Sequence, residues 1–353
     1  MKKVIKFIGG TLGVILLAAA LFIGVLTVTE YKPAEREILI EAHDAEPVIG
    51  PGDSLTIASL NCGYGALGDN ADFFMDGGRS VYTADRERLA ANLSGITETL
   101  KSLDADVIFM QEVDIDSSRS YGTDERTYLR DAIDGADECF AYNFKVLYVP
   151  YPLPPIGRVN SGLYALSSYE IDSAERISLP CPFKWPIRTA NLKRGLEIMR
   201  IPLKDTDKEL VLVNLHLEAF DNGEGKIEQT KKLASILTEE AGKGNYVIAG
   251  GDFNQTFSDV ENPYPVYEGE WQAGLIDKSD FPDDLAFYMD SSAPSCRSLS
   301  RAYAGESADD FPFFIIDGFI VSSNVKVDSM ETISKDFLYT DHNPIRLKVT
   351  LDL

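Results

Sequence analysis

Histidine is scarce in this chain of 353 residues, and two of its three histidines lie where they could do chemistry. His216 ends an apolar run that starts at Leu210, and His342 follows Asp341 just before another apolar run. His43 lies in polar, loop-like sequence. Imidazole is the side chain that titrates near pH 7 without help from its surroundings. The placement of His216 and His342 therefore predicts an acid–base site.

Amides and carboxylates adjoin several apolar runs in the same way. Each placement alone fits a turn or a helix cap, which is the commoner role of a carboxylate just past a strand. Six such placements in chain order are hard to explain as turns, so they predict one shared site. The residues are Asn61, Gln111-Glu112, Asn214 with His216, Asp252 with Asn254, Asp317, and Asp341-His342.

The apolar runs predict many strands and few helices. Residues 85–103 and 227–241 carry apolar side chains at helical spacing. Several strands alternate apolar and polar residues, which favours two packed sheets flanked by helices over a doubly wound parallel sheet. The predicted strands are Leu55–Asn61, Val107–Met110, Gly162–Leu166, Leu196–Ile201, Leu210–His216, Tyr246–Ala249, Ile315–Val321 and Ile345–Leu351.

In its amide, carboxylate and histidine residues and their order, the chain resembles the endonuclease/exonuclease/phosphatase superfamily. This superfamily includes DNase-I-like nucleases, neutral sphingomyelinases and inositol polyphosphate 5-phosphatases. The resemblance covers residues 54–353 in family order. It implies an α/β fold, a four-layer sandwich of two mixed β-sheets flanked by helices. The matching pieces are Asn61, Gln111-Glu112, Ser161-Gly162-Leu163, Asn214-Leu215-His216, Gly251 to Asn254, Asp317 and Asp341-His342.

This resemblance implies hydrolysis of a phosphate ester, which needs charge neutralisation and an activated water. Glu112 is the best predicted metal ligand, because a hard carboxylate suits Mg²⁺, or Mn²⁺ in its place. Asn61 would orient Glu112 or share the coordination. Asp341 would belong to a second metal position.

The remaining polar residues would carry the proton transfers and the phosphate contacts. Asp252 would accept a proton from the attacking water or hold a second ion, and Asn254 would hold a phosphate oxygen. His342 would contact the phosphate as acid or base, with its tautomer fixed by Asp317. His216 would donate to the phosphate or to the leaving oxygen.

Basic and polar residues elsewhere are candidates for substrate contacts, and we predict this role for Arg158, Asn160 and Arg194. The densest basic patch, 184–194, could contact a phosphate or headgroup, or it could be a solvated loop. Gly63 stands where some nucleases of the family carry an acidic residue, which weakens the resemblance to that branch.

The N-terminus predicts a membrane anchor. Lys2, Lys3 and Lys6 precede an uncharged stretch, 7–29, which would span roughly 34 Å as a helix and so cross a bilayer core. The positive-inside tendency places the rest of the chain outside the cytoplasm. A cleaved signal peptide is the alternative. We predict an anchor over 1–30, a spacer over 31–53 and a catalytic domain over 54–353.

The composition bears on partners. The formal net charge of −23 opposes nucleic acid, which proteins normally bind through a basic face. The four cysteines are widely spaced, with no CxxC pair, and are predicted to be buried free thiols. The proline-rich, aromatic loop 148–156 could enter a bilayer interface or pack on the domain.

The sequence thus predicts a single-pass, membrane-anchored, metal-dependent phosphoesterase that faces outward and acts on a lipid headgroup or another small molecule. An extracellular DNA or RNA nuclease is the alternative. A catalytically inactive surface-binding module is a third possibility, opposed by the complete set of acid, amide and histidine residues.

Overall fold

The computed structural model describes residues 2–41, 48–133, 135–221 and 223–352. His43 lies outside the described residues, so the structure places only His216 and His342.

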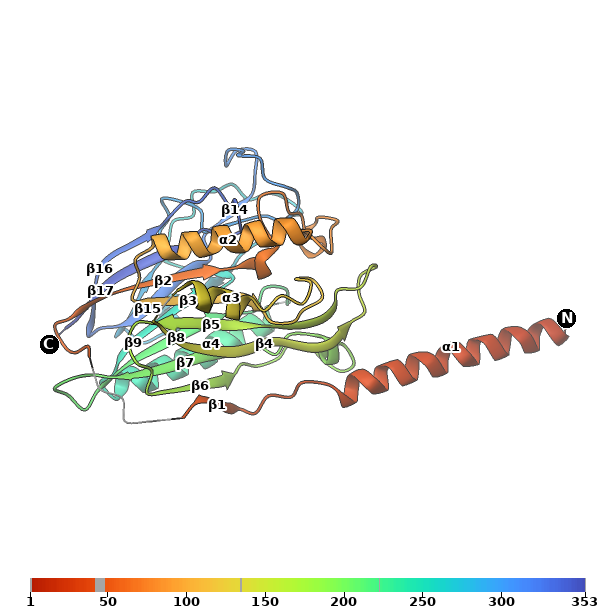
Figure 1. Ribbon diagram of the computed structural model, residues 1–353, viewed down its shortest axis with the longest axis horizontal. Helices are drawn as coiled ribbons and strands as arrows, with labels where there is room; N and C mark the ends of the chain where they lie inside the picture. The colour runs from red at the N-terminus through yellow and green to blue at the C-terminus, as the bar shows by residue number, and fades with distance from the viewer. Residues whose placement is uncertain (1, 42–47, 134, 222, 353) are drawn as a thin grey trace.

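Two large sheets form the centre of the molecule (Figure 1). In each sheet one neighbouring pair is parallel, β8 with β9 and β2 with β3, and the other pairs are antiparallel. The seven-stranded sheet has the order β1 (Arg36–Ile40), β6 (Ser173–Ser178), β7 (Gly195–Pro202), β8 (Glu209–His216), β9 (Tyr246–Asp252), β15 (Asp317–Ser322), β12 (Leu285–Tyr288). The six-stranded sheet has the order β16 (Val325–Thr332), β17 (Ile345–Leu351), β2 (Ser54–Asn61), β3 (Val107–Asp114), β5 (Gly157–Ser167), β4 (Asp137–Val149).

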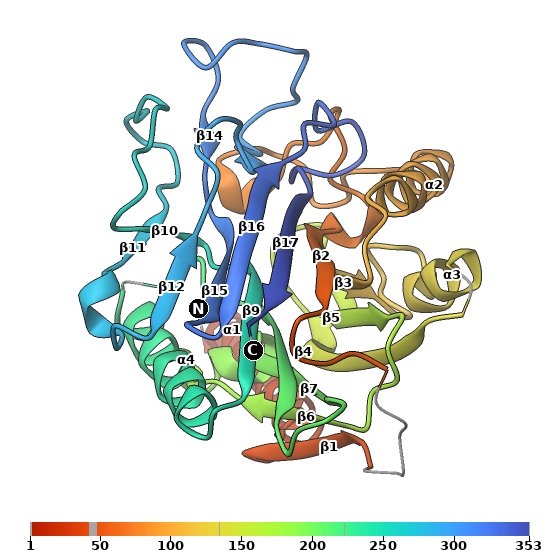
Figure 2. The same ribbon diagram turned by 90° about the vertical axis from the view of Figure 1, so that its left-hand side faces the viewer.

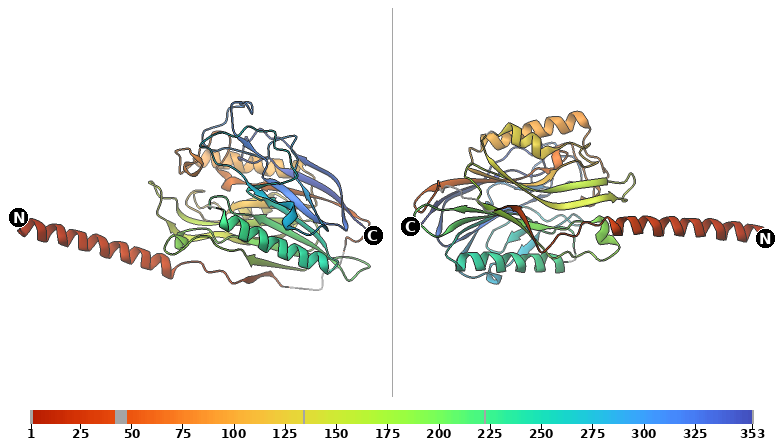
Figure 3. Two further views of the ribbon diagram at one scale, coloured as in Figure 1. Left: turned by 180° about the vertical axis from the view of Figure 1, so that it is seen from behind. Right: turned by 60° about the horizontal axis from the view of Figure 1, so that its bottom comes forward.

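Helices cover the outer faces of the two sheets (Figures 2 and 3). Helices α2 (Arg86–Ser102) and α3 (Glu125–Ala132) pack on the six-stranded sheet, and α4 (Glu224–Gly242) packs on the seven-stranded sheet. The prediction of a four-layer α/β sandwich of two mixed sheets is therefore confirmed. Two short ribbons complete the fold: β10 (Gln255–Phe257) with β11 (Gly274–Ile276), and β13 (Cys296–Arg297) with β14 (Phe313–Phe314).

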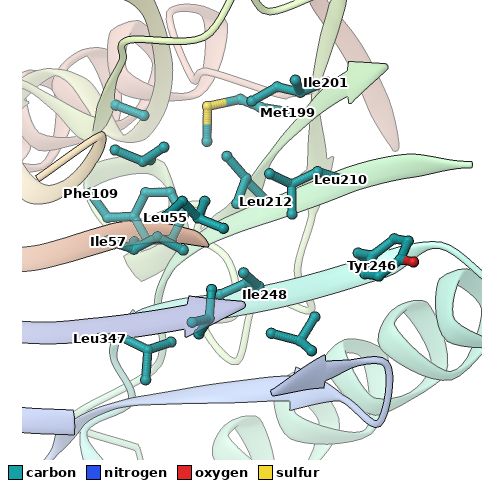
Figure 4. Packing of buried hydrophobic residues seen from close by; sticks show 14 of the residues in the cluster. Leu55, Ile57, Phe109, Met199, Ile201, Leu210, Leu212, Tyr246, Ile248 and Leu347 are labelled. Carbon is teal, nitrogen blue, oxygen red and sulfur yellow. The ribbon is translucent and has the colours of Figure 1, made fainter. Parts of the chain in front are cut away.

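The inner strands are apolar on both faces because both faces are covered. In β8, Leu210 and Leu212 enter the core between the sheets, while Val211 and Val213 pack under α4. Figure 4 shows the inter-sheet core, where apolar side chains from strands of both sheets pack together. Burial of this kind is the main stabilising contribution, about 25 cal/mol per Å² of apolar surface.

The local sequence explains why the first predicted helix of the domain, α2, forms. In α2, Leu89, Leu93, Ile96 and Leu100 follow the helical period and are buried. Asp85 caps this helix by accepting a hydrogen bond from the backbone of Arg88.

Helix α1 (Lys2–Val28) stands apart from the sandwich and is long and apolar enough to cross a membrane (Figure 1). After it, the chain does not run as a plain spacer to residue 53. Arg36–Ile40 forms β1, which pairs antiparallel with β6 at the edge of the seven-stranded sheet. Five residues within the predicted spacer thus form the edge strand of the seven-stranded sheet.

Candidate active site

Strand direction brings the predicted residues to one edge of the sandwich. The parallel strands β2 and β3 both end at this edge, as do β8 and β9. Strands β15 and β17 run antiparallel to β9 and β2, so they begin there. Asp317 is thus the first residue of β15, opposite Asp252, and β15 begins two residues later than the predicted strand Ile315–Val321.

Asp252 lies at the centre of the site and is buried. Its Oδ2 atom accepts a hydrogen bond from Asn61 Nδ2 at 3.1 Å. The same oxygen lies 3.4 Å from Nε2 of His216 and 3.7 Å from Nε2 of His342. Its Oδ1 atom accepts the backbone N–H of Asn254 at 2.8 Å, which fixes the carboxylate plane. One carboxylate therefore contacts both histidines.

His342 is held by a second carboxylate. Its Nδ1 atom lies 2.9 Å from Oδ2 of Asp317, and both residues are buried. Burial by itself lowers the pKa of a histidine, but the neighbouring Asp317 carboxylate outweighs it and raises the pKa of His342 well above its usual value. The shift favours the protonated form of His342, whose Nε2 atom lies 3.7 Å from Oδ2 of Asp252.

His216 is in the opposite state. Burial, followed by the charges of Arg194 and His342, lowers the pKa of His216 well below its usual value. The Arg194 guanidinium also donates to the backbone carbonyl of His216 at 3.1 Å. The surroundings of the two histidines therefore shift their pKa values in opposite directions.

A backbone irregularity presents Glu112 to the site. The register of β3 against β5 shifts between Met110 and Val113, and Glu112 has a positive φ of 54°. Such a bulge re-aims a side chain next to a site. The Glu112 carboxylate faces the cavity and accepts a hydrogen bond from Asn61 Nδ2 at 3.4 Å.

Carboxylates are crowded in this site. Burial raises the pKa values of Glu112, Asp252 and Asp341, that of Asp252 to about 7, and the charge of Asp341 adds to the effect on Glu112. Buried carboxylates that repel one another are stabilised by a divalent cation, and oxygen donors suit Mg²⁺. The donor set of Asn61, Glu112 and Asp341 thus fits a hard metal ion.

Two further clusters have potential ligand atoms within 4.8 Å of one another. One consists of Asp252, Asp317 and His342, and the other of Cys296, Asp341 and His342. Both share His342, so they overlap the same site.

A cavity of about 160 Å³ opens over these groups. Its charged lining is mixed, and its rim is apolar and aromatic. The charged residues that line it are Asp76, Glu112, Asp252, Asp341, Arg119, Arg194 and Arg297. The apolar residues include Leu67, Phe73, Met75, Phe144, Ile156, Leu192, Phe220, Trp271 and Phe314.

The three predicted substrate-binding residues divide. Arg194 lines the cavity and lies 3.6 Å from Glu218. Arg158 and Asn160 do not line it: Arg158 is exposed and pairs with Asp116 at 2.5 Å, and Asn160 donates to the Asp116 carbonyl. The structure thus brings Arg194 to the site and leaves the other two outside it.

Sequence reasoning missed several cavity residues. Arg119 forms a bidentate pair with Asp114. Its guanidinium lies over the ring of Tyr64, with Cζ 3.6 Å from the ring centroid. Asp76 reaches the cavity from the short 3₁₀ turn Phe74–Asp76. These residues lie in polar loops without a repeating pattern, and only the tertiary fold brings them in.

Gln111 and Asn214, although they match the family pattern, lie between the sheets and not in the cavity. Gln111 donates to Asn214 at 2.8 Å, and Asn214 donates to Glu197 at 2.9 Å. They form a buried polar bridge beneath the site.

The prediction of buried free thiols is correct for Cys62, Cys139 and Cys296, which are free and buried. It is wrong for Cys181, which is free but exposed.

Comparison with known proteins identifies the class of the molecule. The model of the Endonuclease/Exonuclease/phosphatase family matches residues 58–342. The chain therefore belongs to this family of phosphoester hydrolases and is an enzyme that acts on ester bonds. A search of curated proteins found no significant match.

Solved structures show the same fold at low sequence identity. The endonuclease/exonuclease/phosphatase of Beutenbergia cavernae is 16% identical, with a TM-score of 0.56, over 85% of this chain and 72% of that chain. A mannosyl-6-phosphatase of Bacteroides thetaiotaomicron is 16% identical, with a TM-score of 0.52, over 84% and 99%. TDP2 of Caenorhabditis elegans is 14% identical, with a TM-score of 0.50, over 85% and 75%.

Proposed function

We propose that the chain is a divalent-metal-dependent phosphoesterase that hydrolyses a phosphodiester or phosphomonoester of a lipid headgroup or another small molecule at the outer face of the membrane. The observation that carries this proposal is the position of Asp252. It lies between two histidines whose pKa values are shifted in opposite directions, beside the crowded carboxylates of one cavity.

Asn61, Glu112 and Asp341 would hold Mg²⁺ or Mn²⁺, with Asn61 also orienting Glu112 through its amide. When bound, the cation neutralises phosphate charge and lowers the pKa of a bound water. Its presence would also relieve the repulsion between Glu112 and Asp341.

The chain's own residues would divide the proton transfers. Asp252, with its pKa raised to about 7, would accept the proton of the attacking water. The charged His342, positioned by Asp317, would stabilise the phosphate oxygens or donate a proton. Neutral His216 would contact the leaving oxygen, and Asn254 at the cavity wall would hold a phosphate oxygen. Environments that push pKa values apart are typical of acid–base pairs.

The size and charge of the cavity support a small substrate. A compact cavity with both acidic and basic walls fits one phosphate and its substituent better than a long nucleic acid, and the net charge of −23 repels polyanions. Of the proteins with this fold, one is by name a sugar-phosphate phosphatase, which supports a compact phosphoester. Arg194 at the cavity wall is the basic residue proposed to contact the substrate.

The N-terminal charge pattern supports the location. The lysines at the N-terminal end of α1 favour a cytoplasmic N-terminus and an outward-facing catalytic domain.

The test is a substrate panel with the full chain purified in detergent. It contains p-nitrophenyl phosphate, bis(p-nitrophenyl) phosphate, phosphatidylcholine vesicles and double-stranded DNA, each with Mg²⁺, Mn²⁺ or EDTA. We expect metal-dependent hydrolysis of a small or lipid ester, abolished by EDTA.

The panel has two contrary outcomes. Cleavage of DNA alone would make the chain a nuclease. The absence of hydrolysis from every substrate, in a folded preparation, would refute the enzyme.

A further inference from the structure

Two loops at the site edge expose large apolar side chains. The β4–β5 hairpin tip carries Leu147, Tyr148, Tyr151 and Leu153, and Leu153 is 88% exposed. The segment around Trp185 and Ile187, between β6 and β7, exposes 57% and 66% of these two residues. We call these six residues the apolar tips. Apolar clusters of this size on a soluble surface mark an interaction site.

The C-terminal end of α1 contacts both loops. The ring of Phe22 packs edge-on against Tyr148, with centroids 6.1 Å apart. Trp185 Nε1 donates to Thr27 Oγ1 at 3.1 Å. Just beyond the helix, Glu30 pairs with Arg188 at 3.2 Å and with Lys193 at 3.6 Å. These contacts fix the candidate membrane span beside the apolar tips.

The contact with Phe22 sets a depth. Phe22 lies six residues before the end of α1 at Val28, which at 1.5 Å per residue is roughly 9 Å inside the helix end. If α1 spans the bilayer, Tyr148 lies beside Phe22, on the membrane side of the point where the helix leaves the apolar layer. Tyrosine and tryptophan are enriched at this interfacial depth.

Charge next to the tips agrees with this placement. Lys184, Arg188 and Lys193 lie beside Trp185, although the chain as a whole has a net charge of −23. Basic side chains near a span end reach lipid phosphates while their stems remain in apolar surroundings.

The tips are continuous with the mouth of the cavity. Tyr151 packs on Phe74 with ring centroids 5.8 Å apart, and the neighbours Phe73 and Met75 line the cavity. Figure 1 shows α1 and the β4–β5 hairpin leaving the sandwich at the end where β2 also ends. The site edge and the membrane span therefore lie at the same end of the molecule.

From these contacts we propose that the apolar tips insert into the bilayer that α1 spans and that the membrane surface is their partner. The cavity then opens toward the lipid headgroups. Given the proposed function, its substrate is a phosphoester held in or at that surface. The docking itself follows from the contacts with α1 and does not depend on catalysis.

The test places a tryptophan at one tip of the full chain in phosphatidylcholine nanodiscs. The chain has two tryptophans, so a Trp185→Phe background leaves only the cavity residue Trp271, whose signal is subtracted. Leu153→Trp is the probe. Val48→Trp is the matched control, because Val48 is 60% exposed and precedes β2 at the opposite edge. Quenching is measured with lipid brominated near the headgroup end of its acyl chains and with aqueous iodide.

We expect the Leu153→Trp emission to be blue-shifted, quenched by brominated lipid and protected from iodide several-fold relative to Val48→Trp. Native Trp185, taken as the difference between the unmodified chain and Trp185→Phe, should behave as the Leu153→Trp probe does. Equal iodide quenching at both introduced positions would overturn the proposal, as would failure of the chain to enter nanodiscs.

Hydrolysis of dissolved bis(p-nitrophenyl) phosphate by the same preparation is scored separately. Absence of hydrolysis from every substrate of the panel, with intact lipid quenching, would refute the phosphoesterase and leave the docking in place.

Discussion

At the scale of single residues, the two site histidines differ because their partners differ. His342 faces the Asp317 carboxylate, whereas His216 is buried beside the Arg194 guanidinium. The same side chain is therefore favoured in its protonated form on one side of Asp252 and in its neutral form on the other. Sequence order alone could not assign these states, since each depends on a residue that is distant in the chain.

His342→Ala should lower kcat by about 10²–10⁴-fold, the usual contribution of a positioned acid or base. The substrate is whichever p-nitrophenyl ester of the panel the unmodified chain hydrolyses. Initial rates with Mg²⁺ check this, and circular dichroism confirms the fold. Glu98→Gln, on the exposed face of α2, is the matched control and should keep full activity. Unchanged kcat in His342→Ala would place the chemistry elsewhere.

Asn61→Ala should weaken Mn²⁺ binding by about 10–100-fold, because its amide contacts both Glu112 and Asp252 and orients the carboxylates. Isothermal titration of the purified chain measures the affinity without any substrate. Asn262→Ala, at an exposed turn, serves as control. Equal affinities in the two variants would remove Asn61 from the metal site.

At the scale of elements, most strands that the sequence predicts are buried on both faces, whereas β17 alternates between buried and more exposed residues. Runs such as Leu210–Val213 are apolar throughout, so composition alone marks them. Strands β1, β4, β6, β12 and β16 were not predicted. Their faces are only partly buried, and a strand such as β1 exists because it pairs with β6, far along the chain.

The site shows the same division between local and tertiary information. Asn61 and Asp252 end buried strands, which the local pattern reveals. Asp317 faces Asp252 only through the register of β15 with β9, and Arg119 enters from a loop. Arg158, which the sequence favoured for substrate, is instead paired with its neighbour Asp116.

Gly251→Ala should displace the Asp252 carboxylate. Gly251 has φ +141°, and an added Cβ would lie 2.1 Å from the carbonyl oxygen of Leu215 in the paired strand β8. Neither backbone can yield without breaking the β8–β9 pairing, so stability should fall by more than about 1 kcal/mol, along with activity. Thermal unfolding and initial rates measure the two effects.

Gly242→Ala is the control for that substitution, since its added Cβ would contact nothing within 4 Å at the end of α4. Similar stabilities of the two alanine variants would show that β9 has more room than its geometry indicates.

The buried bridge between the sheets predicts a pH effect. Burial raises the pKa of Glu197 to about 8, against about 4.3 in an unfolded chain. Between these values folding takes up a proton, so the Glu197 contribution makes stability fall as pH rises, by at most about 1.4 kcal/mol per unit. Glu197→Gln, which stays neutral, should remove this contribution.

Thermal unfolding of the wild type and Glu197→Gln from pH 5 to 8 checks that expectation. The melting temperature of Glu197→Gln relative to wild type should rise with pH. Exposed Glu98→Gln should show no such trend. A constant difference across the range would mean that Glu197 is ionised in the folded protein.

At the scale of the whole molecule, charge and anchoring act in different directions. The acidic surface repels polyanions over about a Debye length, near 10 Å at 0.1 M salt. In the proposed docking, helix α1 and the basic residues beside it hold one edge of the same molecule near lipid. A substrate that reaches the cavity from the bilayer avoids the repulsive field that a dissolved nucleic acid must cross.

The salt dependence of any DNA cleavage follows from this charge. A nuclease that grips the DNA backbone with basic residues loses about 10³–10⁵ in affinity between 50 and 200 mM salt, because bound counterions are released. For a chain with a net charge of −23, added salt screens repulsion instead. Residual cleavage of DNA by this protein should therefore stay constant or increase over that range. Initial rates at fixed Mg²⁺ measure the slope, with dissolved bis(p-nitrophenyl) phosphate as the reference for salt effects on the chemistry. A steep decrease specific to DNA would reveal a local basic groove and favour the nuclease over the small-molecule phosphoesterase.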